Sequence, residues 1–140
     1  MGLFFNDKNN IDNKVVENFG KNDAYLVAIK HNGPIKGLVK LLASTSYNVF
    51  DSNRTFIINF TNKGIYEKEI SNSTKGDFSL LPANEIESLN FDTKDNKAII
   101  SIVHLGKKLS YEIPFNGKIF SNNKRNFENI KSNDWYMIID

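Results

Sequence analysis

The chain has 140 residues and a formal charge of +2, from 18 basic and 16 acidic side chains that are interspersed along the sequence. A single domain of this length can bury most of its apolar surface without a metal ion or a disulfide. The sequence contains no cysteine, which excludes thiol catalysis, thiolate metal sites and disulfide bonds. The balanced charge argues against nucleic-acid binding, because nucleic-acid-binding domains normally carry a concentrated basic stripe.

The start of the chain, Met1–Phe5, lacks the positive region and the long apolar run of a secretory signal. The apolar stretches are also far shorter than the roughly 20 residues that a membrane-spanning helix needs. We therefore expect a soluble, cytoplasmic protein with one domain over residues 1–140, in which residues 1–10 form a loose arm. Asparagine is frequent, with 21 residues, and its scatter indicates a compositional bias rather than a low-complexity tract.

The first predicted element is a short helix over residues 11–19, where apolar side chains recur at helical spacing. Gly20 follows at the position where a C-terminal cap is expected. From Asp23 to His31, apolar residues occupy both faces of an alternating run, which is typical of a strand covered on both sides. Residues 33–53 fit either a short helix or an extended segment, and the sequence leaves both alternatives open.

The clearest local prediction is a β-hairpin formed by Thr55–Thr61 and Ile65–Ile70. The intervening Asn62-Lys63-Gly64 is a tight-turn sequence in which glycine can adopt a positive φ. Four further strand-like runs follow, separated by turn residues: Phe78–Leu81, Ile86–Asp92, Ala98–Leu105 and Leu109–Phe115. The expected fold is therefore mainly β (α+β), with about seven antiparallel strands in a meander.

The pattern becomes helical near the end of the chain. Phe120, Phe127 and Ile130 fall near one face of such a helix, and Ser121 can cap it. We therefore predict an amphipathic C-terminal helix that closes the domain.

The run Trp135–Ile139 fits either a continuation of this helix or a last strand. Large aromatic residues at such a position either pin the helix to the rest of the domain or project as an interface anchor. Trp135 and Tyr136 are therefore candidate partner-binding residues, although pinning is the favoured interpretation.

Three segments resemble bacterial pleckstrin-homology-like (PH-like) domains. They are the arginine-led hairpin Arg54–Tyr66, the proline-to-isoleucine strand entry Leu81–Leu89 and the final strand Leu109–Pro114. The resemblance covers about residues 54–131, whereas the leading helix and an insertion over Pro34–Phe50 depart from the pattern. It implies a PH-like barrel of about seven antiparallel strands, in which the C-terminal helix plugs an open end of the bent sheet.

The resemblance also implies a non-catalytic binding or assembly module without a cofactor. Phosphoinositide-binding relatives carry a basic cluster in the first hairpin, whereas Lys30, Lys36 and Lys40 are spread out here with no arginine nearby. We therefore expect a protein or peptide partner, which can be a second copy of the chain. The alternatives are a membrane-surface adaptor that uses its loop lysines and a β-barrel that carries a small ligand.

Lysines near the last predicted hairpin form the second candidate partner-binding site. Lys107 and Lys108, together with Lys94, Lys97 and His104, can gather basic groups at one end of the hairpin and attract an acidic partner. Ordinary solvated turn chemistry is the competing explanation, and it is the more frequent one.

Paired acidic residues and the two histidines are the remaining candidates for a catalytic or metal site. Glu67 and Glu69 lie two residues apart on a strand, where we expect a solvent-facing pair rather than a catalytic one. Neither histidine has acidic neighbours at a spacing that suits metal ligation. The sequence therefore predicts no enzyme, no catalytic residue and no metal site.

Overall fold

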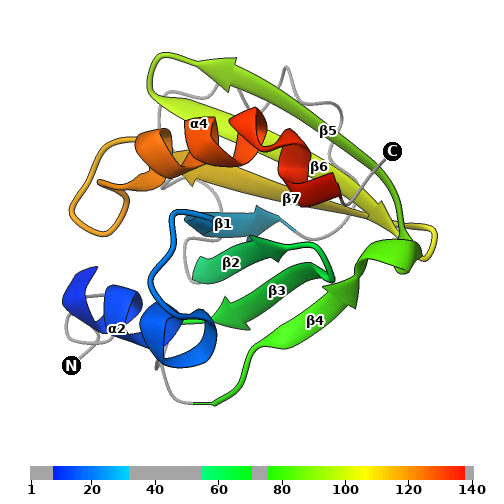
Figure 1. The fold of residues 1–140 in the computed structure, drawn as a ribbon. Coiled ribbons are helices and arrows are strands. Elements are labelled where there is room, and N and C mark those ends of the chain that lie inside the picture. The colour runs from blue at the N-terminus through cyan, green and yellow to red at the C-terminus, as the bar shows by residue number, and fades with distance from the viewer. Residues whose placement is uncertain (1–7, 32–54, 71–75, 138–140) are drawn as a thin grey trace.

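The computed structural model describes residues 8–31, 55–70 and 76–137. Within these ranges, one antiparallel sheet packs against two helices, α2 (Lys8–Phe19) and α4 (Asn123–Ser132) (Figure 1). The sheet has seven strands: β1 (Tyr25–His31), β2 (Thr55–Thr61), β3 (Gly64–Glu69), β4 (Ser79–Pro82), β5 (Ile86–Lys94), β6 (Lys97–His104) and β7 (Lys107–Pro114). The mainly β prediction is confirmed, while the unresolved choice for residues 33–53 lies outside the described ranges.

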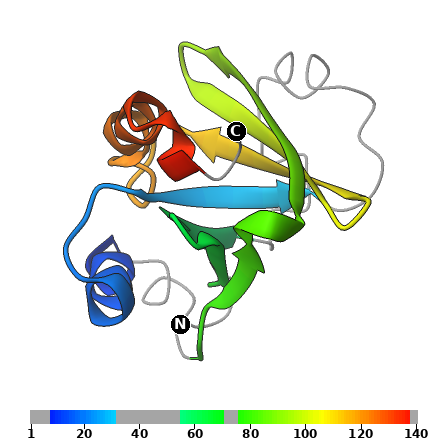
Figure 2. The same cartoon turned by 45° about the vertical axis from the view of Figure 1, so that its right-hand side comes forward.

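The sheet order is β4-β3-β2-β1-β7-β6-β5, so β1 lies in the middle of the sheet. The predicted meander is confirmed within β1–β4 and within β5–β7, where consecutive strands pair, but it is wrong between β4 and β5. Although β4 and β5 follow each other in the chain, they lie at opposite edges of the sheet, and the short 3-10 helix Ala83–Glu85 connects them (Figure 2). The first and second halves of the chain therefore form two wings of the sheet, which are joined where β1 pairs with β7.

Both faces of the sheet centre are covered, as predicted for the first strand. The larger apolar cluster lies on the face covered by α4, here named the inner face, and it includes Leu26, Ala28, Ile58, Phe60, Ile100, Tyr111, Ile113, Phe127 and Ile130. The smaller cluster lies on the opposite, outer face beneath α2 and consists of Ile11, Val15, Tyr25, Val27, Ile57 and Ile70. Successive β1 side chains alternate between these clusters because strand residues point to opposite faces.

Two glycines set the local geometry at positions where the sequence predicted turns. Gly20 has a φ of 76°, and its N–H donates to the carbonyl of Val16 at 2.9 Å, which ends α2. Gly64 closes the β2–β3 hairpin, and a Cβ atom there would lie 2.1 Å from the carbonyl oxygen of Leu81. The hairpin prediction is confirmed. The helix prediction is also confirmed, but α2 begins at Lys8 and includes part of the expected loose arm.

α4 lies where β1 and β7 diverge. These strands pair only over the carboxyl end of the described part of β1, so the preceding edge of β1 faces α4. The buried Asn123 side chain donates from Nδ2 to the carbonyls of Val27 (2.8 Å) and Pro114 (2.7 Å), and its Oδ1 accepts from the N–H of Val27 (2.9 Å). Asn126 donates to the carbonyl of Tyr25 at 3.0 Å. The two amides therefore take the place of a strand partner for β1.

The predicted C-terminal helix is present as α4. Phe127 and Ile130 are fully buried in the inner cluster, as predicted. Phe120 lies before α4 and packs against the outer cluster, so its assignment to the same face was wrong. Ser121 is not the cap, because Asn122 occupies that position, and no side-chain hydrogen bond caps the helix there.

The chain after α4 forms a second short 3-10 helix over Asp134–Met137. Its first three residues have left-handed φ angles of 54°, 57° and 58°. The alternative of a final strand is therefore wrong for this segment, and residues 138–139 lie outside the described ranges.

Candidate functional site

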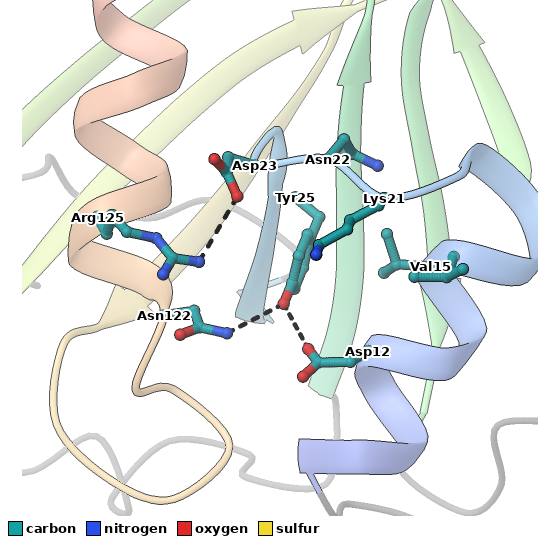
Figure 3. Close-up of a pocket in the computed structure, with 9 residues that line it drawn as sticks. Asp12, Val15, Lys21, Asn22, Asp23, Tyr25, Asn122 and Arg125 are labelled. Carbon is teal, nitrogen blue, oxygen red and sulfur yellow. Dashed lines mark hydrogen bonds and ion pairs between the residues drawn. The ribbon is translucent and has the colours of Figure 1, made fainter.

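A hollow of about 310 Å³ opens on the outer side of the molecule, where α2, the start of β1 and the start of α4 meet (Figure 3). Its walls come from both ends of the chain. Asp12 and the two valines that follow it on α2 form one side, and Asn122 and Arg125 form the other. The segment 21–25, which enters β1, lies between them.

Tyr25 lies at the centre of the hollow and links its two sides. Its O–H donates to Asp12 Oδ1 at 2.5 Å, and its oxygen accepts from Asn122 Nδ2 at 3.2 Å. Burial of the phenol, together with the hydrogen bond to Asp12, raises the pKa of Tyr25 to about 12. The hydroxyl therefore stays protonated even in moderately alkaline solution, and its two hydrogen bonds connect α2 to the start of α4.

Charged side chains form the rim of the hollow. Arg125 Nη2 lies 3.6 Å from Asp23 Oδ1, and both side chains are more than half exposed. Figure 3 shows Arg125 on the α4 side of Tyr25 and Lys21 on the α2 side. Val16, which is 50% exposed, adds an apolar surface. The hollow therefore combines two cations, two carboxylates and an apolar patch.

A second hollow, of about 450 Å³, lies beside the last turn of α2 and the β2–β3 turn. Phe19 contacts the rings of Tyr66 and Phe78 there, with centroid distances of 5.0 and 4.8 Å. Lys63 and Asp77 also line this hollow. Its wall therefore combines three aromatic rings with polar and charged side chains.

The inner face holds a polar cluster that sequence reasoning missed. Glu67 accepts a hydrogen bond from the Tyr111 hydroxyl at 2.7 Å, and Lys30 Nζ lies 2.8 Å from its other oxygen. The Lys30 and Glu67 side chains are only 12% and 10% exposed, so the expected solvent-facing position of Glu67 was wrong. Burial and the neighbouring Glu67 charge raise the pKa of Tyr111. The partners come from three strands, and no local pattern marks them.

The predicted lysine cluster is not formed. Lys107 and Lys108 are exposed at the β6–β7 turn, whereas Lys94 and Lys97 lie at the β5–β6 turn, at the opposite end of β6. Lys97 is buried, and its Nζ lies 3.3 Å from Glu112 Oε2. The four lysines therefore form two pairs at opposite ends of β6, and not the single cluster at one end of the hairpin that the sequence predicted.

The histidine at the end of β6 has an acidic partner. His104 Nε2 lies 2.9 Å from Glu85 Oε1, and both side chains are partly exposed. In the part of the chain that the structure describes, three or more metal-ligating side chains do not come together. The pair therefore links β6 to the 3-10 helix before β5.

The aromatic residues near the C-terminus contact the body of the domain. The Trp135 ring lies 5.6, 5.1 and 5.6 Å from the rings of Phe60, Phe91 and Phe127. Trp135 and Tyr136 are both partly buried against the inner cluster. This placement agrees with the pinning alternative for Trp135.

No family model, curated protein or solved structure matches the chain. Within the described ranges, neither helix has the length and apolar character to cross a membrane. The function is therefore inferred from the geometry of the chain itself.

Proposed function

We propose that the protein is a non-catalytic, PH-like binding module that recognises a protein or peptide partner at the hollow beside Tyr25. The strand order supports the PH-like architecture. Two wings of a bent antiparallel sheet meet at β1 and β7, and the C-terminal helix covers the inner face between them. The sequence resemblance likewise implies a bent sheet of about seven antiparallel strands, with the C-terminal helix at its open end.

The observation that carries the proposal is the hollow at the junction of three elements. Hollows that bind partners combine an apolar surface with a small number of polar groups, and both are present here. The inner face is filled by large side chains, of which Phe60, Tyr111 and Phe127 are each at most 1% exposed. This filling favours a partner bound on the outside over a small ligand carried inside the sheet.

The β6–β7 turn favours a second candidate function, that of a membrane-surface adaptor. Leu105 is 64% exposed, and Lys107 and Lys108 follow it closely. An apolar tip beside lysines can contact an anionic membrane, where each lysine contributes about 1 kcal/mol. With two lysines and one leucine this attraction is small, so protein or peptide binding is the preferred proposal.

A capture experiment tests the proposal. The wild-type protein, Val16→Asp and Leu105→Asp are immobilised, and proteins retained from an extract of the native host are identified by mass. Val16 and Leu105 are both exposed, so each substitution places a charge on an accessible apolar position. We expect a protein that is retained by the wild type and by Leu105→Asp but is lost with Val16→Asp.

Other results of the capture experiment would contradict the proposal or favour the membrane-surface alternative. Identical retention by all three proteins, or retention by none of them, would contradict a binding site at the hollow. Loss with Leu105→Asp alone, together with binding of the wild type to anionic vesicles, would assign the function to the β6–β7 turn.

A further inference from the structure

We infer that the hollow beside Tyr25 binds an acidic peptide segment, with a carboxylate between Lys21 and Arg125 and a neighbouring apolar side chain on Val16. This inference rests on the proposed function and adds the chemistry of the partner. It depends on a difference between the charged groups around the hollow: the carboxylates have partners within the protein, whereas the cations keep unused hydrogen-bond donors.

The two carboxylates of the hollow are already engaged within the protein. Asp12 accepts the short hydrogen bond from the Tyr25 hydroxyl. Asp23 makes one long contact, of 3.6 Å, with the guanidinium of Arg125, so it is held less firmly than Asp12. A ligand that brings a cation would have to compete with these internal partners.

The two cations, in contrast, have unused hydrogen-bond donors. Lys21 is exposed and has no hydrogen-bond or ion-pair partner in the described part of the chain. Arg125 is 66% exposed, and its contacts are long, at 3.6 Å to Asp23 and 3.4 and 3.5 Å to Asn126 Oδ1. An ammonium group has three N–H donors and a guanidinium has five, and a carboxylate is their strongest partner. The excess of donors therefore favours an anionic ligand.

The apolar part of the hollow favours a peptide over a simple anion. Val15 is buried against the sheet, whereas half of Val16 stays in water beside the charged rim. Covering such a side chain with another apolar group is favourable, at about 25 cal/mol per Å² of buried area. An acidic residue next to an apolar residue can satisfy both parts of the hollow at once.

The charge distribution also distinguishes a peptide from a membrane. Asp12 and Asp23 lie on the same side of the molecule as the two cations. A uniformly anionic surface would be repelled by these carboxylates, whereas a single carboxylate can be placed between Lys21 and Arg125. The complementary partner is therefore a peptide with a localised negative charge.

Fluorescence anisotropy tests this inference with two pools of short labelled peptides. One pool has a central Glu-Leu pair, and the other has Gln-Leu at the same position. We expect the wild-type protein to prefer the Glu-Leu pool about tenfold, which corresponds to ~1.4 kcal/mol, and to lose this preference at high salt. Lys21→Glu and Arg125→Gln should each weaken binding of the Glu-Leu pool about tenfold. Lys107→Glu, which reverses the charge of an exposed lysine elsewhere, is the matched control and should bind as the wild type does.

Equal binding of both pools, or equal weakening by Lys21→Glu and Lys107→Glu, would overturn the inference. Binding to anionic vesicles that depends on Lys21 would also overturn it in favour of a lipid surface. The inference and the proposed function can fail separately. If a captured partner depends on Val16 but the Glu-Leu pool does not bind, the acidic chemistry is wrong and the binding module stands.

Discussion

Replacing Asn123 by alanine tests the structural role of α4 most severely. The Asn123 amide is 1% exposed and makes three hydrogen bonds, with the N–H and carbonyl of Val27 and with the carbonyl of Pro114. Asn123→Ala removes all three bonds and leaves these backbone groups without their partner. β1 cannot replace them, because β7 has already diverged from it at this position.

The cost follows from the number of groups that lose a partner. A buried polar group without a hydrogen bond costs about 1 to 3 kcal/mol. Three such groups at the lower end of this range give about 3 kcal/mol, and entry of water at the vacated position keeps the total near that lower end. Since a whole domain is stable by only about 5 to 15 kcal/mol, this one change should remove a large share of the stability.

Urea denaturation followed by circular dichroism measures this difference. Asn129→Ala is the matched control, because its Nδ2 donates to the carbonyl of Asp23 (3.1 Å), just before β1, but in an exposed position. We expect this control to cost less than about 1 kcal/mol. A loss of less than about 1 kcal/mol for Asn123→Ala itself, with an unchanged urea dependence, would refute the reasoning.

Four further predictions concern the core and its buried polar groups. Phe127→Ala should cost about 3 to 5 kcal/mol in urea denaturation, because the ring is fully buried, and a cost below about 1 kcal/mol would contradict the inner cluster. Glu67→Ala should cost about 3 to 5 kcal/mol by the same assay, since it leaves the Lys30 ammonium without its buried partner, and Tyr111→Phe should cost only about 1 kcal/mol. Trp135→Ala should lower the melting temperature without changing the mass measured by light scattering, and a change in association state alone would instead indicate an interface. The folded state raises the pKa of Tyr25 from 10.0 to about 12, so the stability that this hydroxyl contributes is present below pH 10 and is lost as pH rises through 12. Ultraviolet titration of the wild type and of Tyr25→Phe should show that the tyrosine missing from the variant ionises at about pH 12. Ionisation of this tyrosine at the ordinary pH of about 10 would contradict the buried hydrogen bond.

Local sequence patterns predicted most of the individual elements. The hairpin over residues 55–70 was found because two alternating runs flank a glycine turn, and Gly64 does occupy a position that excludes a Cβ atom. The first strand was recognised from apolar residues on both faces, and both faces are buried. These features depend on neighbours in the sequence, so the sequence alone contains the necessary signal.

Features that depend on distant residues could not be predicted in this way. Asn123 and Val27 are 96 positions apart, and the scattered asparagines of the chain indicated only a compositional bias. Glu67 was assigned to a solvent face because a strand pattern does not show which charged residue meets a lysine on another strand. The pairing of β1 with β7 was missed for the same reason, because these two strands lie near opposite ends of the chain.

The candidate site also shows that local features could be predicted from the sequence, whereas contacts between distant residues could not. The sequence singled out Lys107 and Lys108 by their charge, and both are exposed at a turn. The hollow beside Tyr25 was missed because its lining joins residue types that are common on surfaces and come from both ends of the chain. Only the folded structure brings Asp12 and Asn122 to the same hydroxyl group.

The central claim, that a partner is recognised at the hollow beside Tyr25, is tested most directly by site-specific photocrosslinking. A photoreactive phenylalanine derivative is placed at position 16 in one variant and at position 105 in another, and each is irradiated in an extract of the native host. The proposal predicts a discrete crosslinked product from position 16 that Lys21→Glu diminishes, and no such product from position 105. A product from position 105 alone, or the same products from both positions, would contradict it.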